Sequence, residues 1–314
     1  MLKVAIVGTG DHSRIHHGTP CLRLGDRIDR AAVCSLDAAA AAAYAGEFGF
    51  KQSFTDIDHM IDTVRPDVLV VVTPVSANFQ VAKKIIPYRI PMMLEKPPGE
   101  TAAQAAELLA LAESSGTPVM VSFNRRFAPP LQRLCDWAAA NPGLPRPQLL
   151  RAAMFRIARR EPEFVMATAI HALDMIITLM GEPECVEVRP LPEMRNTLVA
   201  TMFFAGGATG IFALHPDTGT VREEYELSGT GYQLRADFIK GFFEAWIDGR
   251  QVDSFQLNPE SSETEMNGAF TETEYFIDCA ERGLFFVPGL RHGVAVMRLA
   301  ETLQKAVNTV QERM

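Results

Sequence analysis

Apolar runs and helical segments alternate along the first 120 residues of the chain. Short aliphatic stretches that read as buried parallel strands are separated by helix-forming segments and short loops. The predicted strands are 3–7, 31–35, 67–72, 91–94 and 119–121, and the predicted helices are 36–48, 56–64, 77–88 and 101–115. This alternation predicts a doubly wound α/β domain with a parallel sheet, in which ligands lie beyond the carboxyl ends of the strands.

The pattern changes after a proline-rich stretch at 127–148. Strands without intervening helices are predicted at 149–157, 197–204, 208–215, 223–228, 232–238 and 252–257. A helix at 163–180 ends at Gly181, and a long amphipathic helix covers about 290–312. We therefore predict a first domain at 1–123 and a second, α+β domain at 124–314 with a large, mostly antiparallel sheet. The last helix is expected to pack near the domain junction.

A glycine turn follows the first predicted strand directly. It consists of Gly8, Thr9, Gly10, Asp11, His12 and Ser13. Two glycines at this spacing allow a tight turn and a close approach of a pyrophosphate, and the N-terminus of the next helix favours the anion. Ser13 stands where a third glycine is usual, and it is small enough for close helix–strand packing. The arrangement predicts a dinucleotide-binding Rossmann domain.

The second strand bears on the choice of cofactor. It ends at Ser35, where an acidic residue would bind the ribose 2′-hydroxyl of NAD. The missing carboxylate removes the repulsion of a 2′-phosphate, yet Leu36 follows where an arginine would bind that phosphate. Asp37 is still able to reach a ribose. The cofactor is predicted to be NAD or NADP, with a slight preference for NADP or dual use.

Glu95-Lys96-Pro97-Pro98 follows a predicted buried strand of the same sheet. A lysine held at the end of such a strand can exchange a proton with an alcohol. The same tetrapeptide is also compatible with a surface lysine in a proline turn. Lys96 is therefore a candidate general acid or base.

The order and spacing of four motifs resemble the Gfo/Idh/MocA family of sugar and cyclitol oxidoreductases. The motifs are Gly8-Thr9-Gly10, Thr73-Pro74, Glu95-Lys96-Pro97 and Asn124-Arg125-Arg126-Phe127. The resemblance continues more thinly through His171-Ala172-Leu173-Asp174. It implies catalytic roles for Lys96 and His171. With the glycine turn and Ser35, it implies a cofactor site that includes Thr73, Pro74, Asn78, Glu95, Lys96 and Asn124.

One position departs from the family pattern. Family members usually carry an aspartate one helical turn before the histidine, and this chain has Ala167 there. A carboxylate partner normally fixes the histidine tautomer. Asp174, Glu161 or Glu163 are possible substitutes. The departure also keeps open a non-catalytic NAD(P)-binding sensor.

The mechanistic hypothesis is hydride transfer between nicotinamide and a ring hydroxyl or ketone of a sugar, sugar acid or cyclitol. Lys96 exchanges the hydroxyl proton, and His171 hydrogen-bonds the same oxygen. Asp174, Arg125 and Arg156 are candidate substrate-binding residues. An alternative is glycoside cleavage or epimerisation with tightly bound cofactor. The substrate and the direction of reaction stay open.

Composition narrows the possible partners of the 314-residue chain. Its formal net charge of −8 argues against a nucleic-acid surface. The five scattered cysteines suggest neither disulfides nor a zinc site, so no metal site is predicted. No apolar run is long enough to span a membrane, and no signal peptide is evident, which predicts a cytoplasmic protein. The family resemblance implies a homodimer or homotetramer formed through the second-domain sheet.

Overall fold

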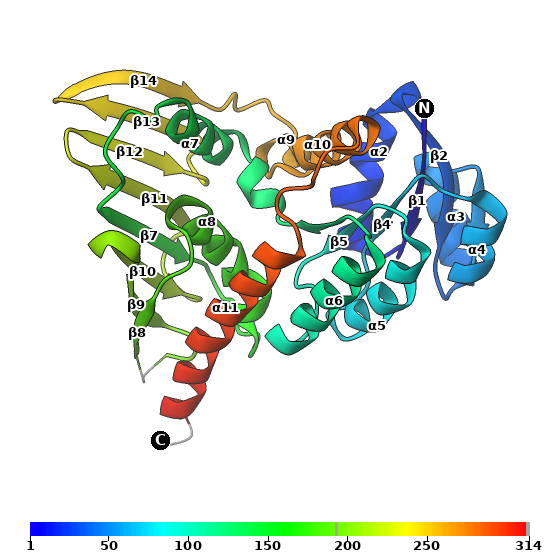
Figure 1. The fold of residues 1–314 in the computed structure, drawn as a ribbon, viewed down its shortest axis with the longest axis horizontal. Coiled ribbons are helices and arrows are strands. Elements are labelled where there is room, and N and C mark those ends of the chain that lie inside the picture. The colour runs from blue at the N-terminus through cyan, green and yellow to red at the C-terminus, as the bar shows by residue number, and fades with distance from the viewer. Residues whose placement is uncertain (192–193, 312–314) are drawn as a thin grey trace. The chain divides into compact units, whose positions relative to one another are not determined.

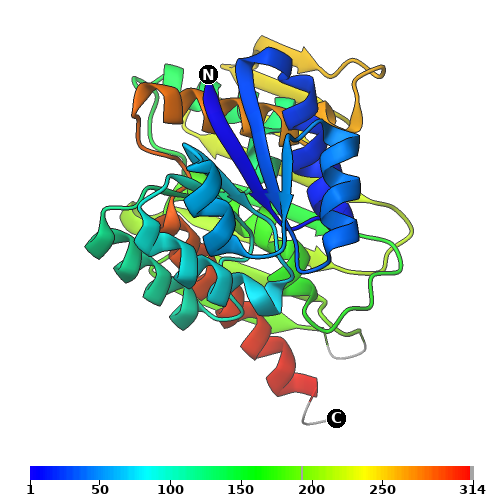
Figure 2. The ribbon, with the colours of Figure 1, turned by 90° about the vertical axis from the view of Figure 1, so that its right-hand side faces the viewer.

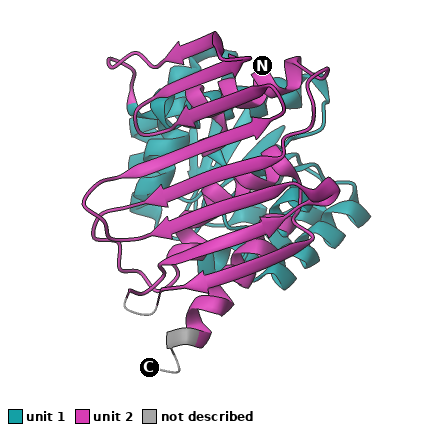
Figure 3. Ribbon diagram, turned by 90° about the vertical axis from the view of Figure 1, so that its left-hand side faces the viewer, with its two compact units in different colours: residues 1–124, 263–294 teal, residues 125–262, 295–314 magenta. Residues whose placement is uncertain are grey.

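The computed structural model describes residues 1–191 and 194–311 of the chain, so Glu312 of the predicted last helix lies outside the described residues. By its internal contacts the chain forms two compact units (Figure 3). Unit 1 contains Met1–Asn124 and Glu263–Val294, and unit 2 contains Arg125–Ser262 and Ala295–Met314. Residues 263–294 were predicted to belong to the second domain. In the structure they belong to unit 1, together with the glycine turn.

Unit 1 is built on a six-stranded sheet in the order β3-β2-β1-β4-β5-β6. Its strands are β1 (Leu2–Val7), β2 (Ile28–Cys34), β3 (Gln52–Phe54), β4 (Val68–Val71), β5 (Met92–Glu95) and β6 (Val119–Ser122). Every neighbouring pair is parallel, and the blue strands run side by side in Figure 2. The predicted doubly wound parallel sheet is confirmed. Strand β3 was not predicted, because its three residues are mostly exposed and carry no apolar pattern.

Helices connect these strands. They are α1 (Asp11–Ser13), η1 (Arg14–Gly18), α2 (Thr19–Arg23), η2 (Gly25–Arg27), α3 (Ala38–Phe48), α4 (Ile57–Val64), α5 (Val75–Ile85), η3 (Ile86–Tyr88) and α6 (Ala102–Ser115). Asp37 caps α3 and Thr101 caps α6 through their side-chain oxygens. Gly49 and Gly116 end these helices in the left-handed conformation. Helices α5 and α6 pack against each other (Figure 1).

Two further helices of unit 1 come from the second half of the chain: α9 (Glu263–Met266) and α10 (Ala269–Arg282). The sequence did not predict α10. Its buried face includes the polar Glu272 and Thr273 beside Phe276 and Ile277, which interrupts the apolar helical period. The Ser122 hydroxyl, at the end of β6, donates a 2.8 Å hydrogen bond to the buried Glu272 carboxylate. This bond joins α10 to the sheet.

Unit 2 is built on an eight-stranded sheet in the order β14-β13-β12-β11-β7-β10-β9-β8. The strands are β7 (Leu149–Phe155), β8 (Cys185–Pro190), β9 (Leu198–Phe203), β10 (Thr209–His215), β11 (Arg222–Gly229), β12 (Tyr232–Asp237), β13 (Phe242–Ile247) and β14 (Arg250–Gln256). All neighbours are antiparallel except β7 and β10, which confirms the predicted mostly antiparallel sheet. Strands β8 and β13 were not predicted, and no residue of β8 is fully buried.

Helices of unit 2 cover one face of this sheet. They are η4 (Asn124–Phe127, shared with unit 1), α7 (Pro129–Ala140), η5 (Val165–Ala169), α8 (Ile170–Met180), η6 (Ala205–Gly207) and most of α11 (Leu290–Gln311). Helix α7 packs on β12 and β13, and α8 packs on β7. The face seen in Figure 3 shows the strands with no helix of the described chain in front of them. None of the described helices combines the length and apolar character needed to cross a membrane.

Candidate nucleotide pocket and acid–base residues

A pocket of about 540 Å³ opens in unit 1 at the carboxyl ends of β1, β2 and β4. Its lining contains nine residues of the predicted cofactor site: Gly8, Thr9, Gly10, Asp11, His12, Ser13, Ser35, Thr73 and Pro74. Four predicted cofactor residues, Asn78, Glu95, Lys96 and Asn124, are not part of this lining. The pocket lies where doubly wound sheets bind their ligands.

The two glycines of the turn do different things. Gly8 has φ +108, and a Cβ there would lie 1.9 Å from the carbonyl oxygen of Val72, so only glycine fits between β1 and β4. A Cβ on Gly10 meets nothing within 4 Å, and its φ of −70 is open to any residue. Gly10 is thus not required by packing within the chain. It leaves open the space through which a pyrophosphate would approach the start of the helical segment at Asp11.

Gly10→Ala is expected to weaken dinucleotide binding about 10- to 100-fold, because steric overlap between the new methyl group and the ligand would reduce the binding free energy by about 1–3 kcal/mol. The thermal melting temperature should stay unchanged, because a Cβ at this position meets no atom of the protein within 4 Å. Fluorescence titration with NADH measures the first effect and a melting curve the second. Gly46→Ala is the matched control, since Gly46 lies in α3 and also has open space around its Cβ. Equal affinity of both variants would show that the ligand does not approach Gly10.

The end of the pocket beside β2 is formed by Ser35 and Leu36. Thr9 donates a 2.9 Å hydrogen bond from its hydroxyl to the Ser35 hydroxyl, and the Leu36 side chain is almost fully exposed. The Asp37 carboxylate accepts hydrogen bonds from the backbone N–H groups of Ala39 and Ala40. Asp37 therefore serves as a helix cap. The residues lining this pocket include neither a lysine nor an arginine.

The Glu95-Lys96-Pro97 turn follows β5, with a cis bond between Lys96 and Pro97. The buried Asn78 amide donates hydrogen bonds to the carbonyl oxygens of Glu95 (2.6 Å) and Pro97 (2.8 Å). Thr73 donates in turn to the Asn78 side-chain oxygen at 3.1 Å. Two predicted cofactor residues, Asn78 directly and Thr73 through Asn78, thus hold the backbone on both sides of Lys96. These hydrogen bonds fix the position of Lys96 at the end of the sheet. The Asn124 amide is engaged with the carbonyl oxygen of Asn267 at 2.9 Å.

The Glu95 side chain meets two histidines of the first helical segment. His12 Nε2 lies 3.3 Å from Glu95 Oε1, and His17 Nε2 lies 3.2 Å from Oε2. Burial alone would raise the pKa of the Glu95 carboxyl, but the hydrogen bonds with His12 and His17 outweigh burial and hold that pKa well below its usual range. Burial, reinforced by the charges of His12 and His17, lowers the pKa of the neighbouring His16 to about 3, so its ring is neutral near pH 7.

In unit 2, His171 is buried in the first turn of α8. Asp174, three residues on, is fully buried, and both of its carboxylate oxygens accept hydrogen bonds from the Arg126 guanidinium, Nε to Oδ2 at 3.1 Å. This forked geometry ties α8 to the Asn124–Phe127 turn. Asp174 therefore has a structural partner, whichever further role it has.

The predicted substrate arginines Arg125 and Arg156 converge on one carboxylate. Both donate to Oε2 of Glu223, which is fully buried at the start of β11. Arg125 also stacks on the Phe238 ring at 4.2 Å, and the Tyr225 hydroxyl donates to Glu223 Oε1 at 3.3 Å. The sequence did not single out Glu223 as a partner, since it lies 98 and 67 residues from the two arginines and no local spacing reveals it.

The helix before His171 contains a π-helical turn, η5, that was predicted as regular α-helix. Ala167 lies within it, and its N–H donates to the Glu163 carbonyl oxygen. Glu161, considered as a substitute for the missing aspartate, is engaged by Arg159 and by the Thr168 hydroxyl. Burial would raise the pKa of Glu161, but the Arg159 hydrogen bond outweighs it and lowers that pKa.

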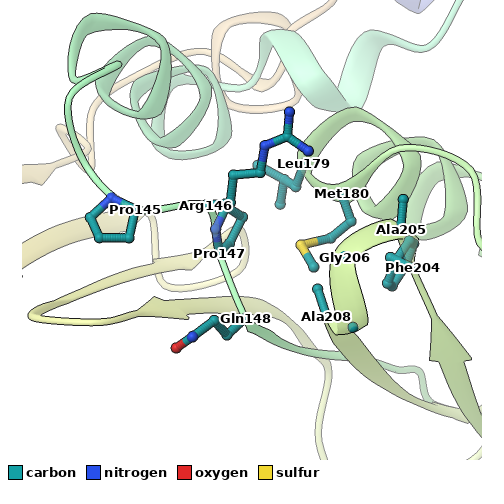
Figure 4. A pocket seen from close by; sticks show the side chains of 11 residues that line it. Pro145, Arg146, Pro147, Gln148, Leu179, Met180, Phe204, Ala205, Gly206 and Ala208 are labelled. Carbon is teal, nitrogen blue, oxygen red and sulfur yellow. The ribbon is translucent and has the colours of Figure 1, made fainter.

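A second pocket, of about 530 Å³, lies in unit 2 between the 145–148 stretch, the end of α8 and the 204–208 turn (Figure 4). Arg146 and Gln148 are its charged and amide side chains, and none of the predicted site residues lines it. It has no lysine, histidine or carboxylate in its lining. We therefore assign the chemistry to the residues above.

A glycine-lined pocket at the carboxyl ends of a doubly wound parallel sheet is typical of dinucleotide-binding Rossmann domains, and one comparison with known proteins covers this part of the chain. A family model described as "Oxidoreductase family, NAD-binding Rossmann fold", that of Gfo/Idh/MocA, matches residues 2–123. The match is confined to the part of the chain that forms most of unit 1.

Individual relatives match parts of the chain. D-Glucoside 3-dehydrogenase of Escherichia coli is 31% identical over 134 residues, which is 42% of this chain and 38% of the relative. The chain spans 36% to 57% of the length of the curated relatives it matches. Among solved structures, UDP-N-acetylglucosamine 3-dehydrogenase of Acidithiobacillus ferrooxidans has a TM-score of 0.84 at 20% identity and covers 99% of both chains. Levoglucosan dehydrogenase in complex with NADH has a TM-score of 0.84 at 16% identity and covers 98% of this chain and 97% of its own. These two likenesses extend the fold over both units.

Proposed function

We propose that the protein is an NAD(P)-dependent oxidoreductase that transfers hydride between nicotinamide and a ring hydroxyl or ketone of a sugar, sugar acid or cyclitol. The observation that carries this proposal is the glycine-lined pocket at the carboxyl ends of β1, β2 and β4, with Lys96 directly after β5 of the same sheet. Gly10 keeps space open before a helix start, which suits a pyrophosphate. Relatives named as dehydrogenases of glucosides, apiose and an amino sugar support the carbohydrate class.

In this mechanism the bound dinucleotide supplies the acceptor or donor of the hydride. Lys96 Nζ takes the proton of the substrate hydroxyl during oxidation and returns it during reduction. Asn78 and Thr73 keep the lysine backbone in place through the hydrogen bonds to Glu95 and Pro97. His171 assists at the reacting oxygen, and Arg125, Arg156 and Asp174 bind or shape the substrate site.

Fluorescence titration with NADH and NADPH, followed by a screen of cyclitols, aldoses, sugar acids and keto-sugars at the nicotinamide absorbance band, tests the proposal. Binding with turnover of at least one carbohydrate supports it. The second candidate is a non-catalytic sensor, favoured by Ala167 at the position where the family usually has an aspartate. Tight binding without turnover across the panel would favour the sensor.

The choice between NAD and NADP is tested at Ser35. Ser35→Asp places a carboxylate where the 2′-phosphate of NADP would lie, and the repulsion of about 1.4 kcal/mol or more lowers NADPH affinity at least about tenfold relative to NADH. Ser35→Asn is the uncharged control of the same size. Parallel titrations with both cofactors measure the ratio. An unchanged ratio in Ser35→Asp would mean that the ribose does not lie against β2.

The open face of the unit 2 sheet supports a homo-oligomer. Along β9, Leu198, Ala200 and Met202 are buried, whereas Val199 and Phe203 point to the other face and are 38% and 37% exposed. Ile211 on β10 is likewise 41% exposed. Apolar side chains on one helix-free face favour pairing with a second copy of the chain. We propose a homodimer or homotetramer formed through this face.

A further inference from the structure

Three side chains of unit 1 converge at the edge of the nucleotide pocket. His12 and His17 come from the helical segment after the glycine turn, and Glu95 comes from the end of β5. One ring nitrogen from each histidine and one carboxylate oxygen of Glu95 all lie within 4.8 Å of one another. Neutral imidazole nitrogens and a carboxylate oxygen are the ligand types of open zinc sites.

The distances among these side chains are close to those around a shared cation. Zinc bonds of about 2.0–2.2 Å to nitrogen and oxygen place neighbouring ligand atoms about 3.3–3.6 Å apart at tetrahedral angles. His12 Nε2 lies 3.3 Å from Oε1 of Glu95 and His17 Nε2 lies 3.2 Å from Oε2, so each contact is close to this spacing and the two oxygens of one carboxylate face both histidines. We propose that His12, His17 and Glu95 form a binding site for a zinc-type divalent cation at the edge of the nucleotide pocket.

The backbone between the two histidines supports this assignment. Residues five apart on a regular α-helix point about 140° away from each other. Arg14–Gly18 is instead a π-helical turn, in which the Thr19 N–H donates to the Arg14 carbonyl oxygen. This i to i+5 pattern turns His12 and His17 toward the same side. Single π-turns inside α-helices are frequent at functional sites.

The surroundings leave one side of the cluster open. His17 and Glu95 are buried, whereas the His12 side chain is 48% exposed and also lines the nucleotide pocket. His17 Nδ1 has no hydrogen-bond partner among the described residues. No hydrogen bond at Nδ1 therefore fixes the ring proton on Nε2, and Nε2 is able to bind a cation. Three protein ligands and an accessible fourth position describe a site that holds a water molecule or an exchangeable ligand. Such a ligand would face the cofactor pocket.

The test uses the full chain without a polyhistidine tag, dialysed against zinc chloride and analysed for metal content. We expect the dialysed protein to contain one zinc ion per chain. His12→Gln should lower zinc affinity at least about tenfold, since even the loss of an outer hydrogen bond to a metal ligand has an effect of that order. His12 is half exposed, so this variant should melt at the wild-type temperature. His59→Gln, an exposed histidine on α4 of the same unit, is the matched control and should retain the wild-type affinity.

Cobalt(II) provides the independent readout of geometry. The wild-type protein with cobalt chloride should show the intense visible bands of a four-coordinate ion, and His12→Gln should lose them. Absence of stoichiometric zinc, or equal zinc affinity in His12→Gln and wild type, would overturn the proposal and leave the cluster as a hydrogen-bonded group. Neither measurement uses cofactor or substrate, so the result is separate from the success or failure of the proposed dehydrogenase activity.

Discussion

Lys96→Ala is expected to reduce kcat about 10²- to 10⁴-fold, because it removes the group that exchanges the hydroxyl proton in the transition state. The dissociation constant of NADH should stay nearly unchanged, since Lys96 is not among the residues that line the glycine pocket. Steady-state kinetics on any carbohydrate found in the screen, together with NADH titration, separates the two effects.

Lys83→Ala is the control for this variant. Lys83 is an exposed lysine of the same unit that pairs with Glu107 at 2.6 Å, and exposed ion pairs contribute only about 0–1 kcal/mol. Its turnover should equal that of the wild type. Wild-type turnover in Lys96→Ala would remove this lysine from the mechanism, and weakened NADH binding with normal kcat would reassign it to the cofactor.

Asp174→Asn is expected to lower the free energy of unfolding by about 3 kcal/mol or more, because it takes the negative charge from a fully buried ion pair and leaves the Arg126 cation in a low-dielectric site. Urea denaturation of both proteins measures the difference. A residue that mainly contacts substrate would instead raise KM with little change in stability.

The exposed pair of Arg133 and Asp253 in the same unit offers the comparison. Asp253→Asn breaks a 2.7 Å contact at the surface and should change the free energy of unfolding by less than about 1 kcal/mol. Equal free energies of unfolding for Asp174→Asn and Asp253→Asn would contradict a structural role for Asp174 and would favour its predicted role in substrate binding.

The features that local sequence controls were predictable. Continuous apolar stretches such as Val68–Val71 specified the parallel strands. Glycine spacing after β1 located the turn that lines the pocket with Ser35 and Thr73. In each case the physical cause lies within a few residues, either in burial on both faces of a strand or in the conformational freedom of glycine.

Contacts between distant parts of the chain were not predictable. His17 meets Glu95 across 78 residues, and Glu223 joins two arginines far from it in sequence. The π-helical turn at Arg14–Gly18 was also not predicted, because a search for a hydrophobic period of 3.6 residues assumes regular α-helix. These features depend on how the sheet brings strand ends together, which one-dimensional spacing does not encode.

Transfer of deuterium from reduced nicotinamide to a carbohydrate is the most direct test of the proposed function. The protein is incubated with NADH or NADPH deuterated at the transferable position and with the panel of keto-sugars and keto-cyclitols, and the products are examined by mass spectrometry. We predict one deuterium on the carbon that bears the new hydroxyl group, and its loss in Lys96→Ala. Bound cofactor with no deuterium in any product would contradict hydride transfer to a carbohydrate.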